Sequence, residues 1–203
     1  MSRPVLMWAE ALAAYGFGPQ HPLAPIRLTL AVQLARELGV LEAFDIIPPT
    51  PLTVDELASV HEPFYVAGVQ EASANPLQAD PLIGLGTPDN PAVAGMHDTS
   101  ALIAGASVEA ARRVWSGQTK RAANIAGGLH HAMPTHASGF CVYNDPALAI
   151  AWMLDHGAQR VAYVDVDAHH GDGVQHIFYD DPRVLTVSIH ESPRTLFPGT
   201  GYP

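Results

Sequence analysis

Apolar residues in this chain recur in blocks of helical spacing and in shorter, more continuous runs. Helical spacing bounded by capping residues and glycines predicts helices over residues 25–38, 53–60, 63–73, 92–115 and 145–156. Short apolar runs predict strands over residues 121–126, 160–167 and 184–190. Strand, helix and strand joined by short connections imply parallel pairing. The pattern therefore predicts an α/β fold built on a parallel sheet.

Local signals set several boundaries of these elements. Thr53 and Glu56 have the spacing of a capping box, which opens a short helix. Asp145 and Pro146 are expected to cap the helix 145–156, and Gly157 ends it. The Pro/Gly-rich stretch 75–91 is predicted to be a long loop, and its length favours a rim or lid.

Composition narrows the class of protein. The chain has 203 residues, 48% hydrophobic and 15% charged, which is typical of one globular domain. It has no apolar run long enough to span a membrane and no signal segment. A single cysteine excludes an internal disulfide framework, so we expect a cytoplasmic protein. The net charge of -10 argues against nucleic-acid binding; it suits a lysine-rich partner, although ordinary solubility explains it equally well.

Several ionisable side chains follow the predicted strand 160–167 in the sequence VAYVDVDAHHGDG. Residues two apart in a strand share a face, so Asp165, Asp167 and His169 converge. Asp167 and His169 can reach one cation as oxygen and nitrogen donors, and Asp165 is better placed as an acceptor behind them. The alternative is a strand end with solvated charges, but ionisable groups after a buried run cost several kcal/mol without partners. The cluster predicts a divalent-metal site.

A second polar segment, AGGLHHAMPTHASGFCVYND, places His130 and His131 after two glycines. After a glycine turn, one ring can face a reaction centre while the other lies behind it. Histidine accepts and returns a proton near neutral pH, so the pair suggests acid–base chemistry. A structural role is the better interpretation of such a pair taken alone, and we assign one to lone histidines such as His61 and His97.

Four motifs in this order resemble the histone deacetylase superfamily: GGLHHA, SGFCVYND, YVDVDAHHGDGVQHIFY and VSIHESPRTLFPGTG. The N-terminal FGPQHPLAPIRL resembles its bacterial acetoin-utilisation branch. The resemblance extends from about Tyr15 to Gly201. It implies a three-layer α/β/α fold with a mostly parallel sheet, similar to arginases and deacetylases, and a cytoplasmic lysine deacetylase. For the acetoin-utilisation branch it implies acetyl-CoA synthetase as a protein substrate.

The resemblance also assigns roles to the polar residues. Asp167 and His169 match two of three protein ligands to a catalytic zinc, or to iron(II) in some members. The matched tandem histidines each have an orienting carboxylate, and the pairs are His130 with Asp165 and His131 with Asp172. His131 would take a proton from water and return it to the leaving lysine amine, while His130 would stabilise charge.

Other matched positions concern a structural cation and the substrate tunnel. Asp165, with backbone carbonyls near His169, Ser188 and Ile189, resembles a monovalent-cation site, usually potassium. The tunnel for the acetyl-lysine side chain is expected to be formed by two aromatic walls, a small residue and a rim acid, which match Phe140, Phe197, Gly139 and Asp89. Without the resemblance, the phenylalanines would be assigned to core packing. The neighbouring Cys141 is expected to be a wall or core residue and not a nucleophile.

The sequence departs from the family pattern in one respect. The third metal ligand, an Asp, and the oxyanion-stabilising Tyr lie downstream of the FPGTG motif in the family, and neither is present before Pro203. Tyr202 does not match the catalytic Tyr. We therefore interpret residues 1–203 as the N-terminal half of a deacetylase domain. The isolated chain is expected to be weakly active or inactive, and to have an exposed sheet edge and poor solubility.

Two other functions are compatible with the same motifs. An amidohydrolase acting on acetylated polyamines or another small amide would share every motif and differ in its loops. A truncated relative that binds without catalysis is the non-enzymatic alternative. Arginase-like chemistry uses two metals and a different ligand pattern and is the weakest match.

Overall fold

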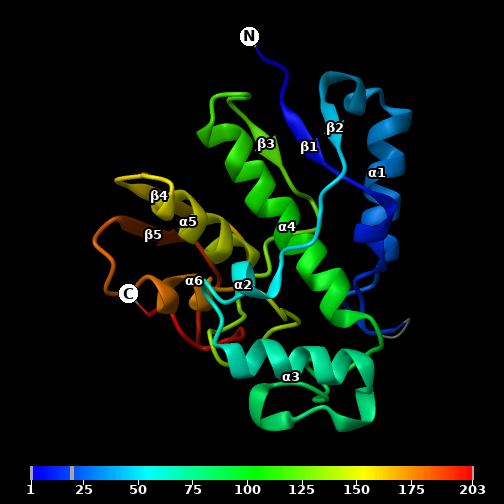
Figure 1. Ribbon diagram of the computed structural model, residues 1–203, viewed down its shortest axis with the longest axis vertical. Coiled ribbons are helices and arrows are strands. Elements are labelled where there is room, and N and C mark those ends of the chain that lie inside the picture. The colour runs from blue at the N-terminus through cyan, green and yellow to red at the C-terminus, as the bar shows by residue number, and fades with distance from the viewer. Residues whose placement is uncertain (1, 19–20, 203) are drawn as a thin grey trace.

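The computed structural model describes residues 2–18 and 21–202 (Figure 1). Its strands are β1 (Val5–Met7), β2 (Asp45–Ile47), β3 (Ala122–Ala123), β4 (Val161–Asp165) and β5 (Val184–Ser188). Its α-helices are α1 (Ile26–Glu37), α2 (Val54–Leu57), α3 (Pro63–Ala74), α4 (Met96–Trp115), α5 (Asp145–Asp155) and α6 (Asp172–Ile177). Short 3-10 helices cover Glu10–Ala14, Val40–Ala43, Pro76–Gln78 and Pro81–Ile83. No helix in the described part is long and apolar enough to cross a membrane.

All strand pairs are parallel, which confirms the predicted α/β class. The strands form two sheets, with the orders β2-β1-β3 and β4-β5. The paired residues include Val5 with Asp45 and, in the second sheet, Asp165 with Ser188. No strand pairing joins the two sheets among the described residues. The sequence predicted one sheet and missed β1 and β2, because strands of three residues are too short to produce a readable period.

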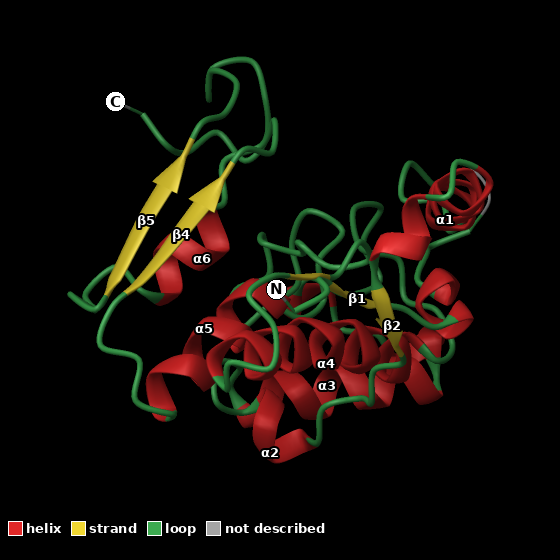
Figure 2. Cartoon of the chain, turned by 90° about the horizontal axis from the view of Figure 1, so that it is seen from above, coloured by secondary structure: helices red, strands yellow, loops and turns green. Residues whose placement is uncertain are grey.

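The β4-β5 sheet buries only one of its two faces. Val161 and Tyr163 pack toward the cluster formed by α5 and α6. On the opposite face Val164 and Leu185 remain 61% and 62% exposed. Figure 2 shows β4 and β5 standing away from β1 and β2, with α6 beneath them. This apolar face of the sheet is therefore open to solvent.

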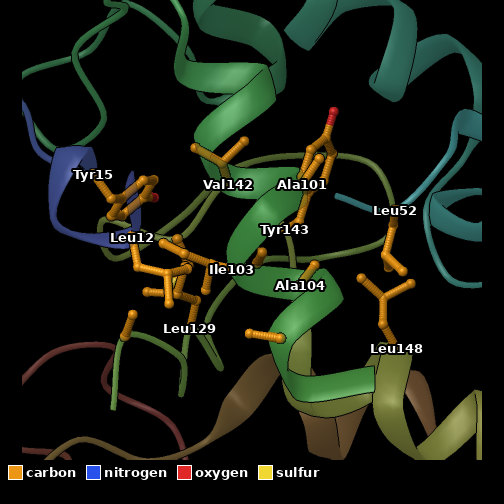
Figure 3. Packing of buried hydrophobic residues seen from close by; sticks show 14 of the residues in the cluster. Leu12, Tyr15, Leu52, Ala101, Ile103, Ala104, Leu129, Val142, Tyr143 and Leu148 are labelled. Atoms are coloured by element: carbon orange, nitrogen blue, oxygen red, sulfur yellow. The ribbon is translucent and has the colours of Figure 1, made fainter. Parts of the chain in front are cut away.

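Helix α4 organises the main core (Figure 3). Its buried small residues, among them Ala101 and Ala104, allow α5 and the segment 50–52 to pack closely against it. The Leu52 amide donates to the Ala101 carbonyl at 3.1 Å. A Cβ on Gly105 would overlap the carbonyl oxygen of Thr50. Small side chains are therefore a packing requirement on this face of α4.

The helix boundaries differ in detail from the sequence prediction. The capping box of Thr53 and Glu56 is present. Helix α4 begins at Met96, because Gly95 before it has a φ of 79°. Asn144, and not Asp145, caps α5, by accepting a hydrogen bond from the Ala147 amide at 3.0 Å. Other bounds also differ: α2 ends before 60, β3 is shorter than 121–126, β4 ends before 167, β5 ends before 190, and loop 75–91 contains two 3-10 turns.

Replacing Gly105 by alanine is expected to destabilise the fold by about 1–3 kcal/mol, because the new methyl group must displace the backbone of Thr50. Urea unfolding monitored by circular dichroism measures this change. Gly68→Ala in α3 is the matched control, because its methyl group would meet only the flexible end of Ile83. Equal stability of the Gly105→Ala variant and the wild type would contradict the packing argument.

Candidate active site

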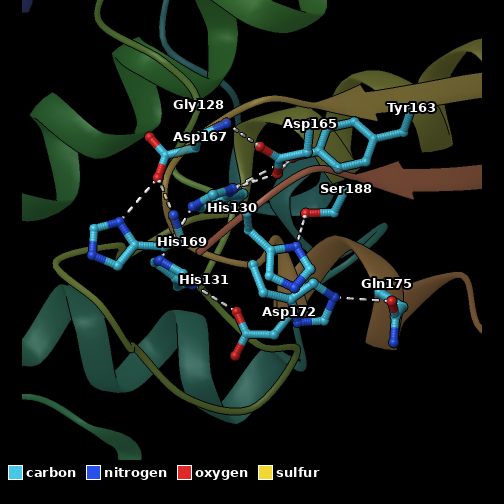
Figure 4. Close-up of polar contacts among 12 residues, drawn as sticks. Gly128, His130, His131, Tyr163, Asp165, Asp167, His169, Asp172, Gln175 and Ser188 are labelled. Atoms are coloured by element: carbon cyan, nitrogen blue, oxygen red, sulfur yellow. Dashed lines mark hydrogen bonds and ion pairs between the residues drawn. The ribbon is translucent and has the colours of Figure 1, made fainter. Parts of the chain in front are cut away.

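The predicted site residues meet around one cavity of about 510 Å³ next to the carboxyl end of β4. Eight of them line it: Asp89, His130, His131, Gly139, Phe140, Asp167, His169 and Phe197. The remaining two, Asp165 and Asp172, lie behind the histidine rings (Figure 4). A second cavity of about 390 Å³ between α2, α4 and α5 is lined by none of the predicted site residues. The chemistry is therefore concentrated at the first cavity.

Each of the tandem histidines is held by its own carboxylate. His130 Nδ1 lies 2.6 Å from Asp165 Oδ2, and His131 Nδ1 lies 2.6 Å from Asp172 Oδ1. Both rings are buried, with 6% and 4% exposure. Because a carboxylate can only accept, each Nδ1 carries a proton. Each Nε2 lies on the edge of its ring that points away from the carboxylate.

The two Nε2 atoms lie 3.1 Å apart. With both rings neutral, two lone pairs would face each other, so this contact requires one proton between them. Burial disfavours the charged form of His130, but the hydrogen bond and charge of Asp165 outweigh burial and raise its pKa. The pair therefore holds one transferable proton in front of two fixed negative charges.

Tyr163 adds a second donor behind His130. Its hydroxyl donates to Asp165 Oδ2, the oxygen that also accepts from His130. Burial alone would raise the pKa of Asp165, but the hydrogen bonds from His130 and Tyr163 lower it to about 2. Asp165 is thus held as a carboxylate. The strand alternation placed Tyr163 on this face, but no sequence signal gave it a role.

Asp167 and His169 lie in the loop after β4, because the strand ends two residues earlier than predicted. Asp167 Oδ1 accepts from the His169 amide at 2.8 Å and lies 2.9 Å from His169 Nδ1. Burial would raise the pKa of Asp167, but the two hydrogen bonds from His169 lower it. The side chains are 55% and 41% exposed, so both donors are accessible from the cavity.

Asp167 and His169 offer an oxygen and a nitrogen donor, which are donor types that bind zinc or iron(II). Metal–ligand distances of about 2 Å in a tetrahedral site separate two donors by about 3.3 Å, so an ion held by Asp167 Oδ1 and His169 Nδ1 would replace the hydrogen that now lies between them at 2.9 Å. Within residues 2–18 and 21–202, however, no group of three or more His, Cys, Asp or Glu side chains is placed to hold a metal ion. Asp167 and His169 can therefore supply two ligands of such a site.

Residues 139–140 and Phe197 line one part of the cavity. Phe140 has a φ of 68°, and Gly139 before it has a φ of 54°. A Cβ on Gly139 would lie 2.7 Å from Cγ of His131, so a larger residue would press on that ring. The Phe197 ring packs edge-on against His131 with centroids 4.9 Å apart. Asp89 Oδ2 accepts from the Gly139 amide at 2.8 Å and so fixes this turn.

Cys141 lies in the wall of the same cavity and is buried. Burial raises the pKa of its thiol far above neutrality. A thiol without thiolate character is a poor nucleophile, which supports the wall assignment made from the sequence.

Sequence reasoning missed the groups that hold the histidine loop from behind. The Asp145 carboxylate accepts from the Gly128 amide at 3.1 Å and the Leu129 amide at 2.8 Å. Asn144 Nδ2 donates to the His130 carbonyl at 3.1 Å and the Ala132 carbonyl at 2.9 Å. The ND pair was visible in the SGFCVYND motif, but it was interpreted only as a helix start.

Comparisons with known proteins agree with the motifs. The family described as the histone deacetylase domain matches residues 21–203. The acetoin utilization protein AcuC of Bacillus subtilis (strain 168) is 44% identical over 203 residues, which are 99% of this chain and 52% of that protein. AcuC of Staphylococcus xylosus is 39% identical over 198 residues, covering 97% of this chain and 51% of that protein. The chain thus spans about half the length of these curated relatives.

A solved structure gives the same result for the fold. The crystal structure of a histone deacetylase homologue from Aquifex aeolicus superimposes with a TM-score of 0.83 at 32% identity. It covers 97% of this chain and 53% of that chain. A structure of a deacetylase homologue complexed with SAHA gives the same values.

The stability of the fold is expected to fall in mild acid because of the buried His61. Burial lowers the pKa of His61 from 6.5 to about 4, so between these values the unfolded state binds more protons than the folded state. The stabilisation by the neutral ring is fully present above pH 6.5 and is lost as the pH falls. At pH 5 the loss in the free energy of unfolding is about 2 kcal/mol.

Urea unfolding at pH 7 and pH 5 tests this prediction, with His61→Gln as the non-titrating control. The free energy of unfolding of the wild type should drop more than that of the variant over this interval. Parallel losses in both proteins would contradict a neutral, buried His61.

Proposed function

The chain belongs to the histone deacetylase family, and on that basis we propose that it supplies the acid–base and metal-binding half of a protein-lysine deacetylase. The proposed reaction hydrolyses the amide of acetyl-lysine to acetate and lysine. The observation that carries the proposal is the pair of carboxylate-backed histidines lining the same cavity as the Asp167–His169 donor pair. Because the chain spans about half of its relatives, the activity of the whole protein is itself part of the proposal.

His131 is the group we assign to proton transfer. Its Nδ1 is fixed by Asp172, and with the shared proton on His130 its Nε2 can accept a proton from the attacking water and return it to the leaving amine. His130, backed by Asp165 and Tyr163, keeps positive charge near the oxygen on which negative charge develops. A zinc or iron(II) ion bound by Asp167 and His169 would supply Lewis acidity toward the amide carbonyl and water.

The other predicted residues fit the binding of a long side chain. Phe140 and Phe197 would flank the aliphatic stem of acetyl-lysine, and Gly139 keeps the passage open. Both hydrogen bonds to Asp89 use Oδ2, and we assign Oδ1 to a backbone amide of the substrate. We also propose a potassium site at Asp165 and Ser188, which are paired in register at the ends of β4 and β5.

An acetylated protein is the substrate class that we propose. The named relatives are acetoin utilization proteins, and the resemblance of this chain to that branch points to acetylated acetyl-CoA synthetase. Acetylated polyamines are the competing substrate, and they are distinguished by the assay below.

Deacetylase activity can be measured on this chain joined at Pro203 to the remaining half of the Bacillus subtilis relative. The joined protein is expected to hydrolyse an acetyl-lysine peptide, whereas the 203-residue chain alone should be inactive or nearly so. His131→Asn should lower kcat about 100- to 10,000-fold because it removes the proton-transfer group. His136→Asn, an exposed histidine in the same segment, is the matched control.

The outcomes separate the candidate functions. Preferred hydrolysis of an acetylpolyamine would assign the chain to small-amide chemistry. A folded, metal-loaded joined protein without turnover of either substrate would favour a binding module. Robust turnover by the purified 203-residue chain would contradict the need for the second half.

Metal binding can be tested on the 203-residue chain itself. Zn²⁺ titration by calorimetry should show a weak site, and Asp167→Asn or His169→Asn should each lower the affinity at least about tenfold. His176→Asn, an exposed histidine on α6, should leave the affinity unchanged. If His176→Asn weakens binding as much as the two loop variants, the ion is bound elsewhere.

A further inference from the structure

The backbone of the tandem-histidine loop is held from behind at each end of residues 128–134. Its amides at Gly128 and Leu129 donate to Asp145, as described above. At the far end the Met133 carbonyl faces His61 Nδ1 at 3.1 Å, and the Pro134 carbonyl accepts from the Glu62 amide at 2.8 Å. The loop is therefore anchored to α5 on one side and to the α2–α3 connection on the other.

His61 links these two anchors. The ring is 1% exposed, and its Nε2 accepts a hydrogen bond from the Asn144 amide at 3.0 Å. An amide can only donate, so Nε2 must be unprotonated and Nδ1 must carry the hydrogen that is donated to Met133. The ring therefore needs one tautomer of the neutral form to make both bonds.

Asn144 connects His61 to the loop that carries His130 and His131. It is fully buried, and its side chain makes three hydrogen bonds. Oδ1 caps α5, while Nδ2 holds the carbonyls of His130 and Ala132. A shift of the Asn144 backbone would therefore move the His130 peptide relative to the carboxylate behind its ring.

Helix α6 begins with Asp172, the partner of His131, and it packs against Asn144 and the histidine loop. A Cβ on Gly173 would lie 2.6 Å from the Ala132 carbonyl oxygen and 2.8 Å from Asn144 Nδ2. Gly173 follows Asp172, the partner of His131. Asn144, to which His61 is bonded, and the loop carbonyls thus lie against the helix that carries Asp172.

We propose that His61 is a positioning residue of the proposed deacetylase site. Its neutral ring fixes Asn144, and Asn144 sets the backbone from which His130 and His131 reach their carboxylates. This proposal rests on the proposed function only in that the loop is catalytic. The competing explanation is core packing, because the ring also lies 5.5 Å from Tyr65 and 5.2 Å from Tyr143, measured between ring centroids.

Proton NMR of the 203-residue chain separates positioning from packing without substrate or metal. Short Nδ1–H···carboxylate hydrogen bonds at His130 and His131 give low-field proton signals, assigned by ¹⁵N-histidine labelling. His61→Phe fills the same space without either hydrogen bond, and we expect both signals to be lost while the circular dichroism stays native. His61→Gln, whose side-chain oxygen can accept from Asn144, should restore them.

Two further variants control for stability. Thr119→Val removes buried hydrogen bonds to Arg3 and Arg121 far from the loop, so it should lower Tm and leave both signals in place. Asn144→Asp keeps the oxygen that caps α5 and removes the donor to the loop carbonyls, so it should lose both signals.

Two results would overturn the proposal, and a third outcome would overturn only the proposed function. One is a folded His61→Phe variant with both low-field signals unshifted, which would reduce His61 to packing. Another is a wild-type His61 that carries its hydrogen on Nε2, a measurement that needs no variant and decides the case if the variants fail to fold. Intact signals in a joined protein without deacetylase activity would refute the proposed function and leave the positioning role standing.

Discussion

The short hydrogen bonds between two imidazoles and two carboxylates are the interaction on which this site depends. Each carboxylate comes from a different element: Asp165 ends β4, and Asp172 begins α6. Both histidines come from one loop, 35 and 41 residues before their respective carboxylates. The contacts of 2.6 Å can form only if the strand, the helix and the loop are placed together to within a few tenths of an ångström.

The surrounding fold supplies that placement through buried polar groups. Asp145 is fully buried, and burial raises its pKa even though it accepts hydrogen bonds from the Gly128 and Leu129 amides and the Ser107 hydroxyl. A buried carboxylate lowers the stability of the fold when it lacks hydrogen-bond partners, and it holds its partners rigidly when it has them. Asp167 and His169 contrast with this arrangement, because they are partly exposed and hydrogen-bonded to each other. The structure thus combines a firmly hydrogen-bonded histidine loop with an accessible pair of oxygen and nitrogen donors.

Much of this arrangement could be predicted from local sequence, and the part that could not depends on distant contacts. The capping box at Thr53 and the parallel strands β4 and β5 follow from spacing alone. The assignment of His130 and His131 to opposing carboxylates came from motif resemblance, and the structure brings those residues together. By contrast, β1 and β2 have only three residues each, and the gap between the two sheets is set by tertiary structure.

The misassigned residues show the same limit. Asp145 carries the signal of a helix start, but its carboxylate turns back to the loop and the cap passes to Asn144. His61 lies 83 positions before its partner Asn144, so no spacing rule connects them. Local sequence patterns predict helix ends and strands, whereas the hydrogen-bond partners of buried polar groups depend on how distant segments pack together.

The most direct measurement of the central claim is the protonation state of His130 and His131 in the metal-free chain, read from their ¹⁵N chemical shifts at pH 7. We predict that both Nδ1 atoms carry hydrogen and that one further proton is shared between the two Nε2 atoms. Finding hydrogen on Nε2 and none on Nδ1 in either ring would show that the carboxylates do not hold the histidines, and the acid–base assignment would fail.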